Sequence, residues 1–487
     1  MSDGPDFTAP QHIYDVLIVG AGPVGLATAI ALLKRGITNI LVIDQTREFR
    51  RVGQVVDLLP NGLRAIKYID PNAYEQIKAS RLGVSKPSSS SVSQSQPAPA
   101  TQRWCKRNLQ GDILRSFPLD FQSWFDRYGE GRVSLPWFNL QTELRNLLPP
   151  EKVLANHRCV HIEDSPDWVR VDSTSNAAES INPFAHWEML RSGSEPSTTP
   201  ETNQASISRR FYAKLVVVAD GINSTIRQVL YRNKGLEEWA KPQYSGFATI
   251  SCFKCDNLPD SILDTLETRY LQGAKVVTLK NDSAQLDTPE SEQTRVSLIR
   301  ISDTAIGYAI TSPIHLDVLQ QSSPAEVLDL GLKILRDAGF LPIFSEIVEL
   351  SAPEKVFYRP YFIHPIASLK DVQSIWCHGR AVLVGDAAHG MPPFMAQGAN
   401  QGLEDAAVVS TYIVQLIQDN GLDDRTAIAN AFHQYENIRR PLIEQVQSGV
   451  QSGKMNCNQW SQLQWDNFNE ILHRREYPSS TTLGKLG

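Results

Sequence analysis

The order of apolar and polar residues predicts a compact β–α–β unit near the start of the chain. Tyr14–Gly20 is a short apolar run typical of a buried strand. In Pro23–Arg35 the apolar residues recur at helical spacing and gather on one face. A second buried strand, Ile40–Ile43, ends at Asp44. A polar residue at that place can serve a ligand bound at the end of the strands.

The same pattern continues in the middle and near the end of the chain. Short apolar runs again predict buried strands, whereas two longer segments alternate apolar and polar residues, as antiparallel strands with one solvated face do. The expected elements are buried strands at Lys214–Ala219 and Ala381–Val384, antiparallel strands at 244–255 and 295–311, and helices at Gln401–Ile417 and Ala427–Val446, the second containing Pro441.

Composition narrows the class of protein. The chain has 487 residues, 41% of them hydrophobic, and a net charge of −6, which argues against broad nucleic-acid binding. We find neither a secretory signal nor an apolar run of about 18 residues, as a membrane span needs. Six scattered cysteines suggest reduced thiols and a cytoplasmic protein. The CxxC formed by Cys252 and Cys255 suits a redox pair, half a zinc site or two ordinary strand residues, and we expect the last. We expect no metal site.

A GxGxxG motif lies at the first strand-to-helix junction. Gly20 permits a tight turn, Gly22 lets a pyrophosphate approach the backbone, and Gly25 lets helix and strand pack closely. The helix start offers amides and a partial positive charge to the anion. Asp44 follows at the distance expected for a carboxylate that binds the adenosine ribose. The motif therefore predicts a bound dinucleotide.

Two further motifs lie far downstream. Ala219-Asp220-Gly221 follows the middle strand and is accompanied by Ser224 and Arg227. Gly385-Asp386-Ala387-Ala388-His389 follows the strand near the end, and Pro393 and Gly398-Ala399-Asn400 come after it. The GxGxxG segment at the start of the chain can hold a pyrophosphate, and the Gly385 segment can hold the ribityl and ring end of the same ligand, which favours a flavin dinucleotide. Only one GxGxxG occurs, so a nicotinamide cofactor must bind transiently.

With these three motifs the chain resembles the group A flavin monooxygenases, the para-hydroxybenzoate hydroxylase family, over roughly residues 12–445. The resemblance implies an α/β fold (α+β overall): a Rossmann-like FAD-binding domain with an inserted mixed or antiparallel substrate domain and C-terminal helices. The expected boundaries are 12–75, 136–240 and 355–420 for the FAD-binding domain, 76–135 and 241–354 for the substrate domain, and 421–487 for the C-terminal helical segment, with flexible insertions at 86–103 and 172–208.

The resemblance also implies a set of cofactor residues. Arg50 and Gln141 occupy positions that the family uses near FAD, and Pro393 is expected beside the flavin ring. Met395 would place a bulky side chain near the flavin edge, where glycine is common. The expected FAD-binding residues are Gly20, Gly22, Pro23, Val24, Gly25, Asp44, Arg50, Gln141, Asp220, Gly221, Arg227, Gly385, Asp386, Pro393, Gly398, Ala399 and Asn400.

The implied activity is flavin-centred. NADPH or NADH reduces FAD, O2 forms a C4a-hydroperoxide, and one oxygen atom hydroxylates or epoxidises an electron-rich aromatic or unsaturated small molecule. No catalytic side chain or general base can be assigned. A flavin reductase, a halogenase and a non-catalytic escort-type binding protein on the same fold remain alternatives. Substrate-lining candidates are Trp137, Phe138, Tyr244, Phe247, Arg300 and Tyr308, each of which also suits ordinary core or surface.

Overall fold

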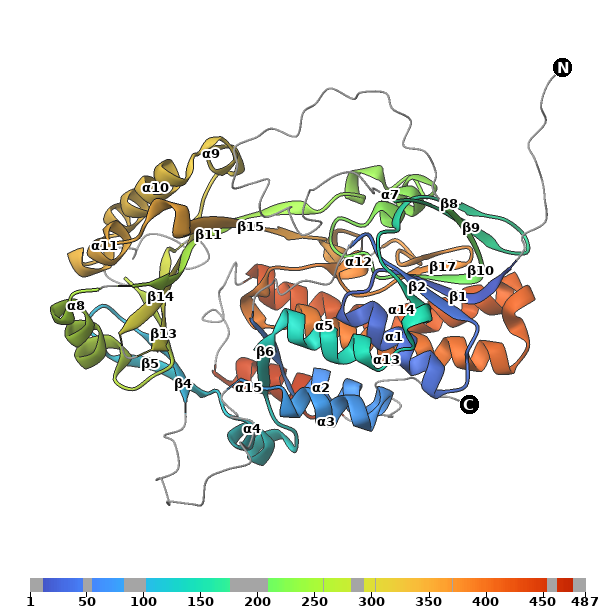
Figure 1. Ribbon diagram of the computed structural model, residues 1–487, viewed down its shortest axis with the longest axis horizontal. Helices are drawn as coiled ribbons and strands as arrows, with labels where there is room; N and C mark the ends of the chain where they lie inside the picture. Colours follow the sequence, from blue (N-terminus) through green and yellow to red (C-terminus); the bar gives the residue numbers. More distant parts are fainter. Residues whose placement is uncertain are drawn as a thin grey trace.

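The computed structural model describes residues 12–46, 55–82, 102–175, 209–281, 293–452 and 462–475, except 257, 303 and 370. Two large sheets lie toward opposite ends of the molecule (Figure 1). The long strands β11 (Gln243–Cys255) and β15 (Val356–Ile363) belong to one sheet and reach toward the other.

The first sheet has a parallel centre, in the order β16-β17-β10-β1-β2-β7, and β9 and β8 extend it antiparallel from β10. Val16 on β1 pairs with Ile40 on β2 and Leu215 on β10. Successive residues of β1 and β2 are buried, so these two strands are covered on both faces, which explains their unbroken apolar sequences. The strands are β1 (Tyr14–Val19), β2 (Ile40–Ile43), β7 (Val153–Leu154), β8 (Arg158–Asp164), β9 (Val169–Thr174), β10 (Arg209–Val218), β16 (Cys377–His378) and β17 (Ala381–Leu383).

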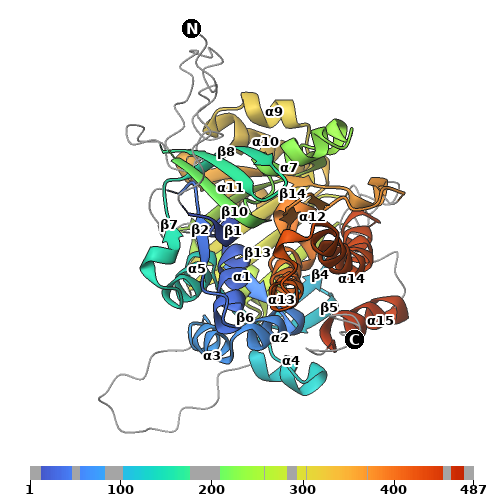
Figure 2. The ribbon, with the colours of Figure 1, turned by 90° about the vertical axis from the view of Figure 1, so that its right-hand side faces the viewer.

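Helices from both ends of the chain pack beside this sheet. Figure 2 shows α1, α13 and α14 next to one another, and α13 also packs on α2. The helices of this part are α1 (Pro23–Lys34), α2 (Pro60–Ile69), α3 (Pro71–Ala79), α4 (Phe121–Tyr128), α5 (Trp137–Asn146), α7 (Thr225–Arg232), α12 (Asp386–His389), α13 (Gly398–Gln418), α14 (Arg425–Ser452) and α15 (Gln462–His473). Pro441 lies inside α14, which continues past it. None of the helices in the described ranges combines the length and apolar character that a membrane crossing requires.

The second sheet is mixed, with the order β15-β11-β14-β13-β12-β4-β5. All of its neighbours are antiparallel except β4 and β12. One face carries buried apolar side chains such as Ile250, Leu298 and Ile310, which pack with residues of the covering helices. The other strands are β4 (Arg103–Arg107), β5 (Ile113–Pro118), β12 (Val276–Lys280), β13 (Arg295–Ser302) and β14 (Ala305–Pro313); the covering helices are α8 (Asp260–Thr265), α9 (Leu316–Gln321), α10 (Pro324–Asp337) and α11 (Pro342–Glu349).

The predicted fold class is confirmed, but two strands join sheets that the expected ranges do not imply. β15 falls within 355–420, yet it pairs with β11 in the second sheet. β6 (Val133–Pro136) falls within 76–135, yet it pairs with β3 (Val55–Leu58) beside the first sheet. The tertiary structure decides which strands pair, and the sequence of a short apolar strand does not indicate which strand it will pair with. The boundaries themselves stay a prediction.

The polar insertions lie largely outside the described residues, but their ends are described. Arg209 on β10 pairs with Ser173 on β9, and Arg295 on β13 pairs with Lys280 on β12. Paired antiparallel strands therefore flank both the insertion 172–208 and a second polar stretch, 281–294. Of the insertion 86–103, only residues 102 and 103 are described. Cys252 and Cys255 both lie on β11 as buried free thiols, at a bulge in its pairing with β14.

Candidate active site

The turn between β1 and α1 requires glycine at position 20. Gly20 has φ +110°, and a Cβ there would lie 2.2 Å from the carbonyl oxygen of Ala219. The Gly20 amide donates to Ile43 O at 2.8 Å, so the turn joins the ends of three strands. Beside Gly22, by contrast, no heavy atom of the described residues, apart from those of its chain neighbours, lies within 4 Å of a Cβ position. Open space at a helix start suits a phosphate group.

Asp44 and Gln141 fix this turn from two sides. The Asp44 carboxylate accepts from Ala21 N at 2.6 Å and from Thr46 N at 2.7 Å. Gln141 Nε2 donates to Ala21 O at 2.8 Å. The buried Oε1 of Gln141 has no hydrogen-bond partner within the described ranges, which suits a polar ligand atom. Arg50 lies outside the described residues.

The Asp220 motif connects the middle strand to α7. Asp220 Oδ2 accepts from Thr225 N at 3.0 Å, and burial raises the pKa of Asp220. Its Oδ1 is buried without a partner among the described side chains and backbone atoms. Arg227 donates to three backbone carbonyls, including Ala387 O at 2.7 Å, and burial lowers its pKa to about 10. Arg227 therefore ties this motif to α12, while Asp220 keeps an acceptor for a ligand.

The first and last motifs meet at the start of α1. A Cβ on Gly385 would lie 3.1 Å from Val24 Cγ2, and one on Gly402 would lie 2.5 Å from the same atom. Asp386 Oδ1 lies 3.7 Å from the Cβ position of Gly398. Asp386 is exposed, although the three residues after it are buried. An exposed carboxylate in a buried turn fits the hydroxyl groups of an elongated ligand.

The start of α13 offers backbone rather than side-chain donors. The first-turn amides of a helix have no partner within it, so those of Gly398, Ala399 and Asn400 can meet a ligand. The Asn400 side chain is engaged: its Oδ1 accepts from Leu59 N at 2.8 Å, and its Nδ2 donates to a neighbouring carbonyl. Pro393 is exposed just before this helix.

Met395 packs against side chains from the C-terminal helices. It packs against the cluster formed by Val446, Phe468 and Leu472, which joins α14 to α15. The sequence suggests instead a side chain near the flavin edge. Nothing in the local sequence indicates this contact, because α15 lies far along the chain.

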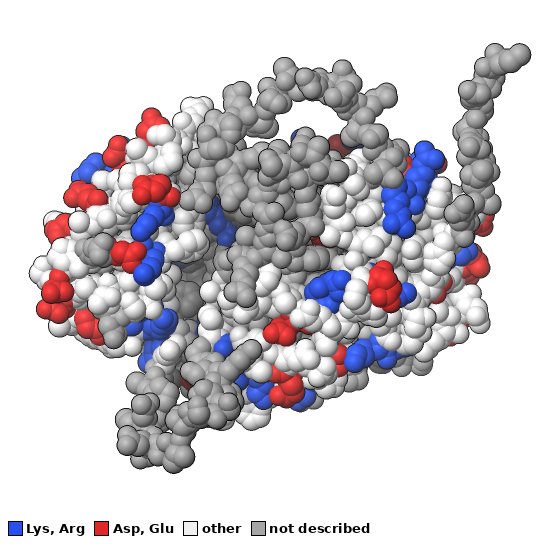
Figure 3. Space-filling model, in the orientation of Figure 1, with Lys and Arg blue, Asp and Glu red and all other residues white. Residues whose placement is uncertain are grey.

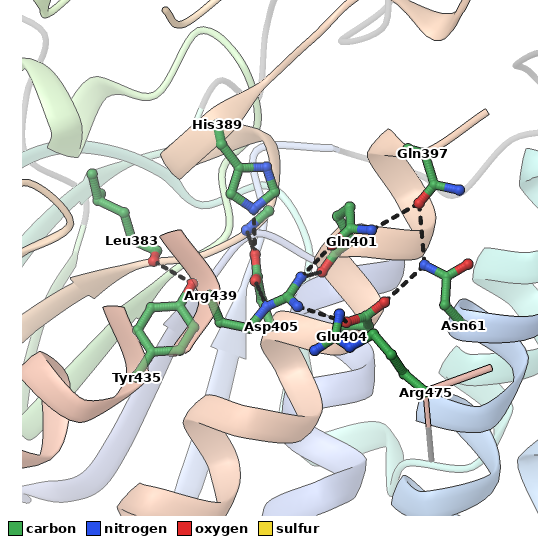
Figure 4. A network of polar contacts seen from close by, with 11 residues as sticks. Asn61, Leu383, His389, Gln397, Gln401, Glu404, Asp405, Tyr435, Arg439 and Arg475 are labelled. Atoms are coloured by element: carbon green, nitrogen blue, oxygen red, sulfur yellow. Dashed lines mark hydrogen bonds and ion pairs between the residues drawn. The ribbon is translucent and has the colours of Figure 1, made fainter. Parts of the chain in front are cut away.

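Buried side chains of α12, α13 and α14 form a polar network that the sequence analysis did not predict. His389 Nε2 and Asp405 Oδ2 are 2.5 Å apart, and Arg439 donates to Asp405 and Glu404 at 2.8 and 2.6 Å (Figure 4). The side chains of all four are fully buried. Tyr435 OH donates to Leu383 O at 3.2 Å nearby.

Among the predicted substrate residues, Phe247 approaches the loop before α13. Its ring lies 6.3 Å from that of Phe394, measured between centroids, in an edge-on arrangement. Tyr244 is on the same strand, but its hydroxyl donates to Ile314 O at 2.6 Å. Phe247 is therefore the member of the predicted set that links the second sheet to the α13 loop.

The other four candidates lie elsewhere. Tyr308 is buried in the apolar core behind the second sheet. Arg300 forms an ion pair with Glu267. Trp137 and Phe138 begin α5, which packs on α1 and α3 beside the first sheet. The structure therefore does not gather the six candidates into one cluster.

Three hydroxyl side chains that the sequence analysis did not select lie on the face with Phe247. Thr249 Oγ1 is 2.9 Å from Thr311 Oγ1 and 2.8 Å from Tyr361 OH. The Tyr361 ring lies 5.2 Å from that of Phe394. The available signal was the strand period: Thr249 follows Phe247 by two residues and so shares its face.

Comparison with known proteins supports a flavoprotein class. The family model of the FAD binding domain matches residues 13–54 and 351–449. The 3-amino-4-hydroxybenzoate 2-monooxygenase of Streptomyces platensis is 25% identical over 89% of this chain and 86% of its own. Salicylate hydroxylase of Pseudomonas putida is 22% identical over 92% and 87%. The crystal structure of Klebsiella pneumoniae HpxO with FAD and uric acid has a TM-score of 0.60 at 18% identity, covering 96% of this chain and 94% of that one, and shows the fold.

The fold and the paired motifs define an FAD-binding oxidoreductase. Within that class the comparisons support an FAD-dependent monooxygenase, and the chain is similar to the group A enzymes. It uses FAD, with NAD(P)H as electron donor and O2, to oxygenate a small molecule. The open space beside Gly22, the free acceptors of Gln141 and Asp220, and the exposed Asp386 fit such a cofactor.

Proposed function

We propose that FAD lies along the line from the α1 start to the α13 start. Gly20, Gly22, Pro23, Val24 and Gly25 would border the pyrophosphate, whose charge suits the helix start. The support is the packing of Val24 against Gly385 and Gly402, because it brings the two motifs together. The rest of the proposed set is Asp44, Arg50, Gln141, Asp220, Gly221, Arg227, Gly385, Asp386, Pro393, Gly398, Ala399 and Asn400.

The substrate would lie between the α13 loop and the face of the second sheet that carries Phe247, Thr249, Thr311 and Tyr361. The observation that carries this proposal is the ring contact of Phe247 and Tyr361 with Phe394. Aromatic side chains can stack on an aromatic substrate, and the hydroxyls can orient its polar groups.

We further propose an aromatic hydroxy acid as substrate. Arg359 pairs with Thr249 across the sheet, and Arg295 pairs with Thr311, so two cations share the hydroxyl-bearing face. Burial lowers the pKa of Arg359, while nearby Tyr361 and Asp386 oppose that shift. A guanidinium suits a carboxylate. The named relatives act on salicylate and 3-amino-4-hydroxybenzoate, which are acids of this kind.

When bound, FAD supplies the hydride acceptance and the oxygen activation of the reaction. This chain's residues would bind, orient and exclude water. The α13 amides would face the flavin pyrimidine edge and stabilise negative charge there. The Thr249 hydroxyl, which is hydrogen-bonded to both Thr311 and Tyr361, would orient a phenolic group of the substrate toward the flavin ring.

The test is turnover of the FAD-loaded protein with NADH or NADPH and a matched panel of compounds. Salicylate and 4-hydroxybenzoate form the acidic arm, and phenol and catechol the neutral arm. We expect the acidic arm to accelerate NAD(P)H oxidation, with oxygen uptake and a product containing one atom from labelled O2. Stimulation by the neutral arm alone would exclude the hydroxy-acid proposal. Oxidation of NAD(P)H without any oxygenated product would contradict the proposed site.

We also propose that the protein is cytoplasmic and that it does not bind nucleic acid. Five described cysteines are buried free thiols, as suits a reducing compartment. On the face in Figure 3, lysine and arginine side chains are interspersed with aspartate and glutamate. A mixed surface of this kind does not favour a polyanion.

A further inference from the structure

Glu404 lies in the interior of the FAD-binding part and contacts Arg475, which follows the C-terminal helix α15. Its Oε2 accepts from Arg439 Nη1 at 2.6 Å and from Arg475 Nη1 at 2.7 Å (Figure 4). Its Oε1 accepts from Asn61 Nδ2 at 2.7 Å. The Glu404 and Arg439 side chains are fully buried, and that of Arg475 is 11% exposed. A carboxylate at this depth requires compensation by nearby cations.

Arg475 is the second guanidinium that contacts the buried carboxylates of this cluster. Glu404 and Asp405 supply two negative charges, and Arg439 and Arg475 supply two positive charges. His389 contacts Asp405 and adds no negative charge. Without Arg475, Glu404 would share the single guanidinium of Arg439 with Asp405. The balancing charge comes from the residue two positions after α15 ends.

The position of α15 is set by contacts on both sides of the α13 start. The His473 ring packs edge-on against Trp124 and Tyr128 of α4, with centroids 5.4 and 5.1 Å apart. Arg64 of α2 donates to His473 O. On the other side, Phe468 lies in the cluster that holds Met395. These contacts bring Arg475 to Glu404 at a defined place.

We propose that Arg475 is an electrostatic positioning residue of the flavin site. Glu404 follows Gly398 by six residues, which is about 9 Å along a helix. A buried charge at this distance acts on the ring end of the cofactor through a medium of low polarity. By neutralising Glu404, Arg475 keeps the α13 start positive and so stabilises the negative charge that the flavin gains on reduction. This inference rests on the proposal that the α13 amides face the flavin.

The experiment measures the midpoint potential of FAD bound to the full-length protein in single and double variants. Arg475→Met leaves one uncompensated negative charge, so the potential becomes more negative. Glu404→Gln leaves one uncompensated positive charge, so the potential becomes more positive. In Glu404→Gln/Arg475→Met the charges balance again, and the potential returns toward the wild-type value. A role in packing alone would not move the two single variants in opposite directions.

Arg474→Met is the matched control, because Arg474 is the preceding residue and pairs with Glu470 on the exposed side of α15. Its potential should equal that of the wild type. Single variants that shift the potential in the same direction, or not at all, overturn the inference. Where Arg475→Met does not retain FAD, recovery of FAD binding in the double variant supports the inference, and its absence overturns it. Wild-type protein that binds FAD away from α13 would instead contradict the proposed cofactor site.

Discussion

The interiors that pack against the two sheets differ in polarity. Beside the first sheet, charged side chains are fully buried and bonded to one another, as with Arg439 and Asp405. Behind the second sheet the interior is mainly apolar and includes Leu298 and Ile310, while the hydroxyls of Thr249 and Thr311 lie on the opposite face. Buried charges fix a geometry tightly because each lost partner is costly, whereas an apolar core tolerates changes on its outer face. The contrast suggests that the first part fixes the cofactor and the second can vary its ligand.

The sharpest way to break this contrast is Arg439→Met. The variant leaves Glu404 and Asp405 short of a buried partner, so we expect a loss of about 3–5 kcal/mol in the free energy of unfolding, together with weaker FAD binding. Chemical denaturation and FAD titration measure the two effects. Lys333→Met is the control, because its exposed pair with Asp337 contributes roughly 0.3–0.5 kcal/mol. Equal losses in both variants would show that burial adds nothing to the contribution of the Arg439 ion pairs.

Leu298→Ala tests the second interior. Leu298 is fully buried, so the cavity should lower the free energy of unfolding by about 2–5 kcal/mol. Because the change lies behind the sheet, FAD affinity measured on the folded protein should stay at the wild-type value. Ile301→Ala, at a residue 43% exposed, should change stability by less than about 0.5 kcal/mol. A large fall in FAD affinity in Leu298→Ala would show that the two parts are coupled through the sheet.

Acid should destabilise the first part through its buried histidines. Burial lowers the pKa of His364 to about 3, from an ordinary value of 6.5. Between these values the unfolded chain binds a proton that the folded protein does not, so stability falls as pH decreases, by up to about 1.4 kcal/mol per pH unit. His364→Asn should remove that share of the slope in unfolding experiments from pH 7 to pH 4. His473, with its pKa also lowered to about 3, should contribute an equal share. If the dependence of stability on pH is unchanged in both His364→Asn and His473→Asn, the lowered pKa values of these histidines are contradicted.

The smallest expected effect comes from Thr249→Val on the hydroxyl face. Loss of the bonds to Thr311 and Tyr361 should cost about 1 kcal/mol of substrate binding, which corresponds to a KM roughly fivefold higher. FAD affinity should not change. Thr265→Val, on α8 and bonded only within its own helix, should leave KM at the wild-type value. An effect of Thr249→Val on FAD affinity without one on KM would place the substrate elsewhere.

Much of the cofactor part is readable from the chain because its signals are local. Gly20 is required by its own backbone conformation, and Val24 and Gly385 lie beside strands whose apolar runs identify them. The substrate part was harder to predict. Tyr308 and Thr249 lie on neighbouring strands of one sheet but face opposite sides, and only the register reveals this. A one-residue shift of a strand reverses every side chain, so composition cannot select the exposed face.

The sequence by itself determined the glycine turn between β1 and α1, the class of cofactor and the fold class, since each is indicated by short motifs or by the period of apolar residues. Only the tertiary structure decided that Arg475 reaches Glu404 and that Phe247 meets Phe394. These pairs join elements far apart in sequence. Their contact depends on how whole helices and sheets pack, which no short segment encodes.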